Sequence, residues 1–254
     1  MALVAGIVTL VTVAIFGFHG GDGTQAGTAA GSAASTESRS EARSEPRPKA
    51  VRVPVEAPET LGSDPASFQS DPWLRNLAKT TEIPQRALVA YIQAAHRVSE
   101  EYPECGLGWN TLAGIGFVES EHGTLFRGKI YRDGVARPKI FGVPLDGGQT
   151  EAIPDTDQGV LDGDSQWDRA IGPMQFIPET WLLWQSDGNG DGIADPHQID
   201  DAALTAARYL CHTGRDLTVP ENWILAIETY NNTIDYNHRV ADAANHYANL
   251  AATQ

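Results

Sequence analysis

The sequence predicts a mainly α (α+β) fold, with one long excursion of loops and short strands, in residues 71–254. Apolar residues recur there at helical spacing in several segments, which is the pattern of amphipathic helices. Residues 124–168 are instead rich in Gly, Asp and Pro and are too long for an ordinary connection. Residues 20–50 contain almost no large apolar side chains, so they cannot offset the entropy cost of folding. We therefore expect one folded domain that follows a flexible tether at residues 19–70.

An apolar run, ALVAGIVTLVTVAIFGF, occupies residues 2–18. It is long for the core of a signal peptide and slightly short for a membrane span, and no Lys or Arg precedes it. A cleaved signal peptide and a retained membrane anchor both stay open for residues 1–18, and both imply export. A buried core helix is the remaining alternative, and the unstructured composition of the next segment argues against it.

Charge and cysteine content narrow the class of protein. The formal net charge of −15 at pH 7 repels phosphate backbones, so we expect no nucleic-acid partner. The two cysteines, Cys105 and Cys211, indicate one disulfide in an exported protein, and two buried free thiols are the alternative. The sequence has no CxxC, HExxH or spaced Cys/His cluster, so no zinc site is predicted.

The helices can be placed in order along the chain. Residues 71–103 are helical in character, with Pro84 in a first turn and Pro103 as the end. The next helix is expected over residues 110–122, with Asn110 or Thr111 as its cap and Gly123 as its stop. Short strands or hairpins are expected around residues 138–147. Four further helices are predicted over residues 178–185, 201–211, 220–230 and 236–251.

The helix expected over residues 110–122 carries an acid on its apolar face. Glu119 shares one stripe with Leu112, Ile115 and Gly116, so its carboxyl group should lose water and its pKa should rise. A raised pKa retains the proton that a general acid needs near neutral pH. The alternative is a buried structural acid paired with an arginine or a backbone donor. Gly114 and Gly116 weaken the helix, which suggests close approach of another backbone or a ligand.

Three motifs in order resemble those of the lytic transglycosylases, specifically their membrane-bound B-type group. The first, GFVESEHG, supplies an E-S pair at Glu119 and Ser120, with Gly123 four residues after the acid. The second, RAIGPMQFIPETW, fits the pattern G-x-x-Q-F-x-P-x-x-[WF] and contains Gln175. The third, ETYNN, places Tyr230 and Asn231 after an apolar helix. The resemblance covers essentially the whole domain.

The resemblance implies a lysozyme-like helical domain that cuts the β-1,4 bond between N-acetylmuramic acid and N-acetylglucosamine in peptidoglycan. Glu119 would act first as acid and then as base, forming a 1,6-anhydromuramyl product without consuming water. Gln175 would bind a sugar group near the cut, and Tyr230 would hold either Glu119 or the acetamido group. Asn231 would bind the same sugar, and Ser120 would bond to the acetamido carbonyl or to the helix backbone. Phe176 and Trp181 are expected in the core.

The segment SDGNGDGIADPHQIDD resembles an EF-hand loop, with a glycine where the sharp turn is needed. Position 12 is Gln198 rather than a bidentate Glu, so Asp200 or Asp201 would have to replace it in a longer loop. We expect a structural Ca²⁺ here, and a solvated acidic turn is the alternative. The predicted ligands are Asp187, Asn189, Asp191, Ile193 through its carbonyl, Asp195 and Asp201.

Other functions stay open at this stage. A muramidase that uses water would need a second carboxylate facing Glu119, which the aspartates of residues 124–168 could supply. A catalytically silent wall-binding protein is a second alternative, and an EF-hand calcium sensor is disfavoured by the single imperfect loop. We expect a monomer outside the bacterial cytoplasm, exported or anchored to the cytoplasmic membrane by the N-terminal segment, with the peptidoglycan glycan strand as its partner.

Overall fold

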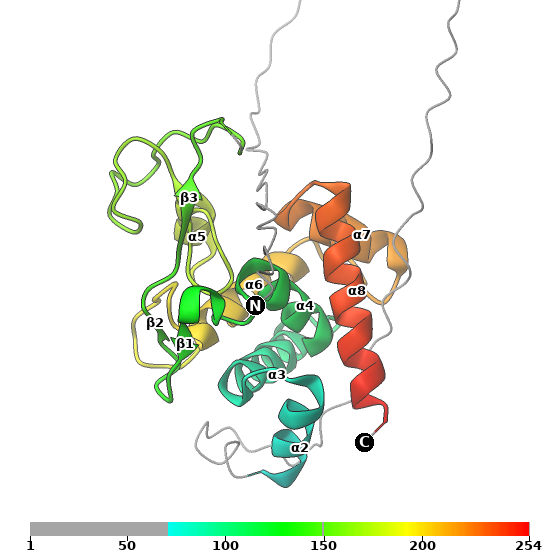
Figure 1. The fold of residues 1–254 in the computed structure, drawn as a ribbon. Helices are drawn as coiled ribbons and strands as arrows, with labels where there is room; N and C mark the ends of the chain where they lie inside the picture. The colour runs from blue at the N-terminus through cyan, green and yellow to red at the C-terminus, as the bar shows by residue number, and fades with distance from the viewer. Residues whose placement is uncertain (1–70, 149, 254) are drawn as a thin grey trace, which may run out of the picture.

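The computed structural model describes residues 71–148 and 150–253. The fold is mainly α, which confirms the predicted fold class (Figure 1). The expected signal or anchor at residues 1–18 and the tether at residues 19–70 lie outside the described residues. The α-helices are α2 (Pro72–Thr81), α3 (Gln85–Glu101), α4 (Trp109–Ser120), α5 (Pro178–Trp184), α6 (Ile199–Cys211), α7 (Pro220–Tyr230) and α8 (Ile234–Ala251).

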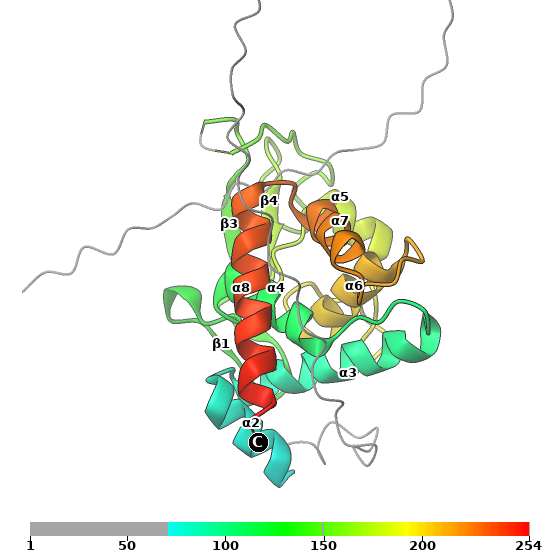
Figure 2. The same ribbon diagram turned by 90° about the vertical axis from the view of Figure 1, so that its right-hand side faces the viewer.

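The helices form one body around α4. Helix α4 packs against α8 and α3, and α3 also packs against α6. The strands and α5 lie to one side of these helices, and α8 crosses α4 on the other side (Figures 1 and 2). A single hydrophobic cluster runs through α2, α3, α4, α6, α7 and α8, so these helices share one core.

Close helix contacts explain the two glycines of α4. A Cβ atom at Gly114 would lie 2.9 Å from the Val240 carbonyl oxygen of α8, and one at Gly116 would lie 2.0 Å from the Tyr91 hydroxyl of α3. Both positions therefore need glycine, as the sequence suggested. Helix α4 is buried on nearly all sides, because α3 and α8 enclose it.

The predicted cap of α4 is wrong. The helix begins at Trp109 with Gly108 as its N-cap, and no side chain caps its first turn. Asn110 lies inside the helix and donates a 3.1 Å hydrogen bond from Nδ2 to the Ala244 carbonyl oxygen of α8. A contact with a distant helix thus replaces the local cap. The helix also ends earlier than predicted, at Ser120, and Glu121 is its left-handed C-cap.

Residues 124–168 form the predicted excursion. It contains a 3-10 turn (Leu125–Arg127), β1 (Lys129–Ile130), β2 (Ala136–Arg137) and β3 (Phe141–Pro144). Strand β1 pairs with β2, whereas β3 pairs antiparallel with β4 (Arg169–Ile171) beyond the end of the excursion. The short strands expected near residues 138–147 are therefore present, and β4 forms the first three residues of the second sequence motif.

Cys105 and Cys211 form the expected disulfide, with Cα atoms 5.5 Å apart. The bond joins the loop before α4 to the end of α6, across 106 positions of the chain. Within residues 71–148 and 150–253, no helix has both the length and the apolar character needed to cross a membrane.

Candidate functional site

Glu119 lies in the last turn of α4, where the helix meets α8. Its exposed fraction is only 7%. Its Oε1 atom accepts a 2.6 Å hydrogen bond from the hydroxyl group of Tyr236, a residue of the first turns of α8. Burial raises the pKa of Glu119 to about 8, and the Tyr236 hydrogen bond and the nearby charge of Arg239 oppose this shift. The carboxyl group is therefore protonated at neutral pH, as a general acid must be.

A narrow crevice of about 10 Å³ reaches Glu119. In its present form it has room for roughly one water molecule, so a sugar oxygen can approach the acid only if side chains at the mouth move. Among the described residues, Glu119 is the only carboxylate in the crevice wall. The other wall residues that bear polar or aromatic groups are Gln175, Phe176, Thr180, Tyr209 and Tyr230.

Gln175 reaches the crevice from a strained turn. Its φ angle is +49°, and its side-chain Nε2 donates a 2.8 Å hydrogen bond to the Gly172 carbonyl oxygen. Gly172 itself has a φ of +74°, and a Cβ atom there would lie 1.8 Å from the Pro196 carbonyl oxygen. A Cβ atom at Gly142 would lie 3.2 Å from Oε1 of Gln175, so that glycine leaves room for the amide group. The turn thus places Gln175 in the wall of the crevice that Glu119 also lines.

Ser120 connects α4 to the same turn. Its hydroxyl group donates a 2.6 Å hydrogen bond to the Pro173 carbonyl oxygen and accepts a 2.7 Å hydrogen bond from the Gly123 backbone N–H. The side chain is fully buried and does not line the crevice. Ser120 therefore fixes the position of the Gln175 turn relative to Glu119.

Tyr230 and Asn231 lie at the end of α7. The Tyr230 hydroxyl donates a 2.7 Å hydrogen bond to the Met174 carbonyl oxygen, and its ring stacks on that of Tyr236, with centroids 6.4 Å apart. The hydrogen bond to Glu119 comes from Tyr236 instead. Asn231 is fully buried, and its Oδ1 accepts hydrogen bonds from the backbone N–H (3.1 Å) and hydroxyl (2.9 Å) of Thr233, the N-cap of α8. Asn231 thus shapes the turn that delivers Tyr236.

Phe176 and Trp181 are in the core, as predicted. Their exposed fractions are 2% and 1%, and their rings contact each other edge to face. Tyr209 and Thr180 line the crevice but were not singled out from the sequence. Neither belongs to a helical stripe with Glu119, so only the packing of α5 and α6 against β4 and α7 brings them there.

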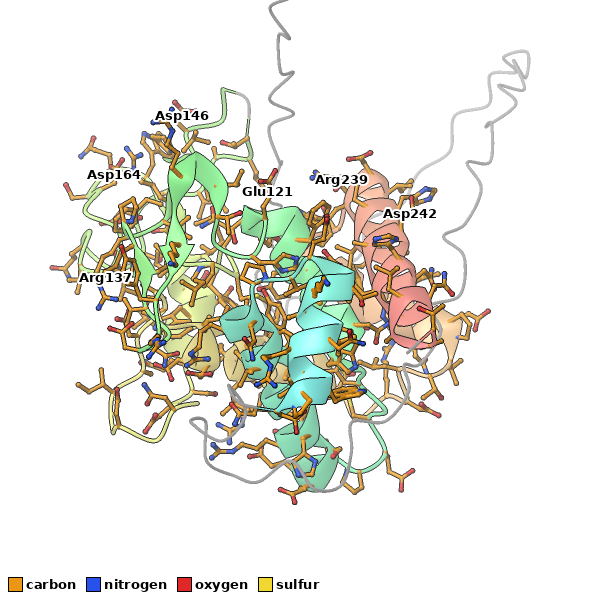
Figure 3. All side chains as sticks on the ribbon, turned by 60° about the horizontal axis from the view of Figure 1, so that its bottom comes forward. Glu121, Arg137, Asp146, Asp164, Arg239 and Asp242 are labelled. Carbon is orange, nitrogen blue, oxygen red and sulfur yellow. A yellow bond between two sulfur atoms is a disulfide. The ribbon has the colours of Figure 1, made fainter. Side chains whose placement is uncertain are left out.

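A larger hollow of about 640 Å³ lies on a different face of α4. Phe117 and Glu121 of the α4 end and Arg239 and Asp242 of α8 line it, and Figure 3 shows the three charged residues along one edge of the molecule. Glu119 does not line this hollow. Its carboxylates are exposed, so it lacks the buried acid that distinguishes the crevice.

The EF-hand-like loop folds around its own carboxylates. Asp187 accepts hydrogen bonds from the backbone N–H groups of Gly190, Asp191 and Gly192. Asp201 is fully buried at the start of α6 and accepts hydrogen bonds from three N–H groups of the loop, including a 2.8 Å bond from Gly188. Burial raises the pKa of Asp201 to about 6.

Oxygen donors at alternate positions and one buried carboxylate fit a hard cation. Asp200, the other candidate for the end of the loop, instead forms an ion pair with Arg86. The structure thus distinguishes the two aspartates that the sequence left open: Asp201 is the one that faces the loop.

Residues 155–253 match the family model described as Transglycosylase SLT domain. The match supports a lysozyme-like domain of the lytic transglycosylase type, with peptidoglycan as its substrate. The matched range contains Gln175, Tyr230, Asn231 and Tyr236 but begins after Glu119, so the assignment of the acid rests on the geometry described above. Neither the curated proteins nor the solved structures that were compared gave a significant match to the chain.

Proposed function

We propose that this protein cleaves the β-1,4 bond between N-acetylmuramic acid and N-acetylglucosamine and forms 1,6-anhydromuramyl products, with Glu119 as acid and then base. The observation that carries the proposal is a buried carboxyl group, held by Tyr236, which is the only carboxylate of the described crevice wall. The match to a transglycosylase domain is consistent with this chemistry.

The first step needs a protonated acid. Glu119, whose pKa is about 8, donates its proton to the glycosidic oxygen as the bond from that oxygen to the muramyl C1 breaks. The N-acetylglucosamine leaves as an alcohol, and the substrate's acetamido oxygen stabilises the positive charge at C1. The amide of Gln175, which both donates and accepts, lies where it can bind this group.

The second step needs the carboxylate that the first step produces. Glu119 removes the proton of the muramyl C6 hydroxyl, and that oxygen bonds to C1 to close the anhydro ring. The acid is restored and no water is consumed. The Tyr236 hydroxyl stabilises the carboxylate between the two steps, because a hydrogen bond to the charged form lowers its free energy.

A hydrolytic muramidase is less well supported. Inverting and retaining glycosidases place a second carboxylate within about 5–9.5 Å of the acid. Within the described part of the chain, no aspartate of the excursion lines the crevice. None of them shifts the pKa of Glu119 either, since the one charge that acts on it is that of Arg239. A single carboxylate favours the intramolecular route.

The proposal includes a calcium ion in the loop 187–201 with a structural role. Asp187, Asn189, Asp191, Asp195, the Ile193 carbonyl and Asp201 would hold it, and the ion would neutralise the buried charge of Asp201. We expect chelator to lower the melting temperature, and Asp187→Asn to remove most of that effect. The exposed Asp235→Asn variant is the control. Identical melting curves of the wild-type protein with and without chelator would exclude the ion.

The proposal on cellular location rests on the sequence of residues 1–70. The apolar run and the polar segment after it suit export, followed by anchoring to the bacterial cytoplasmic membrane or by release as a monomer. This arrangement, together with the three motifs, favours the membrane-bound B-type group. Detection of the protein in the membrane fraction would distinguish a retained anchor from a cleaved signal.

The decisive experiment is a digest of purified peptidoglycan followed by mass spectrometry. Anhydromuropeptides, which are one water lighter than hydrolysis products, should form with the wild-type protein and disappear with Glu119→Gln. Glu121→Gln is the matched control, because Glu121 lies at the end of the same helix but is exposed. Reducing-end products would instead establish a muramidase, and products from Glu119→Gln would exclude Glu119 as the acid.

A further inference from the structure

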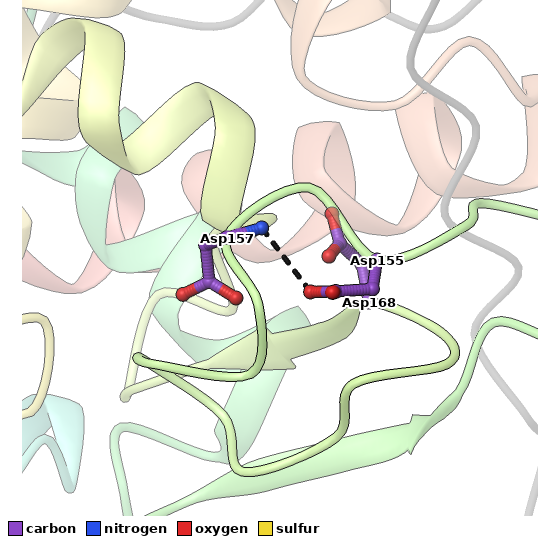
Figure 4. A group of neighbouring side chains, drawn as sticks. All are labelled: Asp155, Asp157 and Asp168. Carbon is purple, nitrogen blue, oxygen red and sulfur yellow. Dashed lines mark hydrogen bonds between the residues drawn. The ribbon is translucent and has the colours of Figure 1, made fainter.

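A second group of carboxylates lies at the end of the excursion, away from both the crevice and the EF-hand-like loop in sequence. An antiparallel bridge between Pro154 and Trp167 brings the two arms of the excursion together. One carboxylate oxygen each from Asp155, Asp157 and Asp168 then lies within 4.8 Å of the others (Figure 4). Asp155 and Asp168, thirteen positions apart in the chain, thus lie close together, and Asp168 directly precedes β4.

Most oxygens of this cluster accept hydrogen bonds from the excursion. Asp168 accepts from the backbone N–H (2.9 Å) and hydroxyl (2.7 Å) of Thr156. Asp155 Oδ1 accepts from the Asp157 N–H, and Asp157 Oδ2 accepts from the Leu161 N–H at 2.6 Å. Asp157 Oδ1 is different: it is buried, and no donor of the described residues reaches it. A buried carboxylate oxygen without a donor is unfavourable unless another positive group stands beside it.

Among the described residues, no ion pair supplies that positive charge. The neighbouring cation, Arg169, forms its ion pair with Asp164 at 2.9 Å. Asp162 adds a further carboxylate, which accepts a 2.7 Å hydrogen bond from the Arg169 backbone N–H. Negative charge is therefore in excess at a largely buried place.

We propose that Asp155, Asp157 and Asp168 bind a calcium ion, with Asp157 Oδ1 as one of its ligands. Carboxylate oxygens are the ligands of hard cations, and Ca²⁺ bonds of about 2.3–2.6 Å allow ligands up to roughly 5 Å apart. Mg²⁺, with bonds of about 2.0–2.1 Å, holds its ligands within roughly 4.2 Å and prefers to keep its water. Three carboxylate oxygens that lie within 4.8 Å of one another can share one calcium ion.

The ion would connect the excursion to β4, the strand that leads to the candidate site. Asp155 and Asp157 follow Pro154 on one side of the bridge. Asp168 follows Trp167 on the other side and directly precedes β4, which leads to the turn of Gln175. Asp168 already exchanges backbone hydrogen bonds with Leu145 and Ile153. Calcium would therefore fix the start of β4 without touching the crevice.

Isothermal titration calorimetry on the chelator-treated full chain tests the proposal. We expect Asp157→Asn to bind one calcium ion fewer than the wild-type protein, or to bind it at least tenfold more weakly. Asp155→Asn should give the same loss. The matched control is Asp146→Asn, an exposed acid of the same excursion that should bind as the wild-type protein does. Magnesium should bind at least tenfold more weakly than calcium to the site that Asp157→Asn removes.

Thermal melting separates loss of the ion from loss of the fold. Without calcium, Asp157→Asn should melt no lower than the wild-type protein, because the substitution removes a repelled charge. With calcium, the wild-type protein should gain more in melting temperature than the variant does. Equal calcium stoichiometry and equal calcium-induced shifts in the wild-type protein and Asp157→Asn would overturn the site, as would tighter binding of magnesium.

Discussion

The hydroxyl group of Tyr236 donates a 2.6 Å hydrogen bond to Oε1 of Glu119, across 117 positions of the chain. The bond joins the first turns of α8 to the last turn of α4. It acts against burial, which alone would raise the pKa of the carboxyl group still further. In the proposed mechanism, Tyr236 is thus the side chain that tunes how readily Glu119 changes from the acid of the first step to the base of the second.

Replacement of Tyr236 by Phe should shift the pH dependence of glycan cleavage. A hydrogen bond to a charged group contributes about 1.5–3 kcal/mol, which corresponds to an upward pKa shift of roughly 1–2 units when it is lost. We expect the pH optimum to rise. The rate at pH 7 should fall by about tenfold or more, because the carboxylate formed in the first step loses the Tyr236 hydrogen bond that stabilises it. Tyr230→Phe, which loses a bond to Met174 rather than to Glu119, should lower activity without this shift. Equal pH profiles of both variants would contradict the role of Tyr236.

Stability should fall with rising pH because of Glu119. Its pKa is about 8 in the fold against 4.5 in the unfolded chain, so the folded state retains the extra proton between these values. The stability linked to this proton is complete below pH 4.5 and is lost as the pH rises through 8. The loss approaches at most about 1.4 kcal/mol per pH unit. Urea unfolding of Glu119→Gln at several pH values should lack this slope, and a parallel slope in the variant would place its origin elsewhere.

Replacement of Gly116 by Ala should destabilise the domain. The added Cβ atom would lie 2.0 Å from the Tyr91 hydroxyl and 2.8 Å from the ring carbon that bears it, so α3 and α4 would have to separate. Overpacking of this kind costs about 1–3 kcal/mol or more. Gly148→Ala is a suitable control, since its nearest neighbour is a side-chain oxygen of exposed Asp146 at 3.2 Å. Chemical denaturation of both variants measures the difference, and equal midpoints would contradict the contact.

Loss of the disulfide should weaken the fold through the unfolded state. The bond closes a loop across 106 positions, for which loop-closure entropy predicts about 4–5 kcal/mol. Reductant should therefore lower the urea midpoint of the wild-type protein. The double variant Cys105→Ser, Cys211→Ser should unfold at that lower midpoint with or without reductant. An unchanged wild-type midpoint after verified reduction would show that the bond contributes little.

Local patterns in the sequence located most helices. The helix predicted over residues 220–230 has the same bounds as α7. The start of α4 was missed because Asn110, a good cap by type, bonds to Ala244 of another helix. Capping rules describe neighbours in the chain and carry no information on a partner 134 positions away.

In the candidate site, too, local sequence patterns predicted some of the residues and missed others. The helical stripe through Leu112, Ile115 and Glu119 correctly placed the acid in a buried position. Tyr236 was missed because it lies beyond the third motif, and its contact partner Glu119 is 117 positions away in the chain. One usable signal exists: Thr233 caps α8 and places Tyr236 three residues later, on the first turn after the Tyr-Asn pair.

The position of Tyr236 in α8 has a consequence for when activity can arise. Helix α8 follows all three motifs in the chain, so a partly emerged or partly folded polypeptide already contains Glu119 and Gln175 but not the hydroxyl that holds the acid. The packing of α8 against α4 supplies that group and helps to bury the carboxyl. Under the proposed function, the complete acid site therefore forms only once the C-terminal helix has packed, which links cleavage activity to completion of the fold.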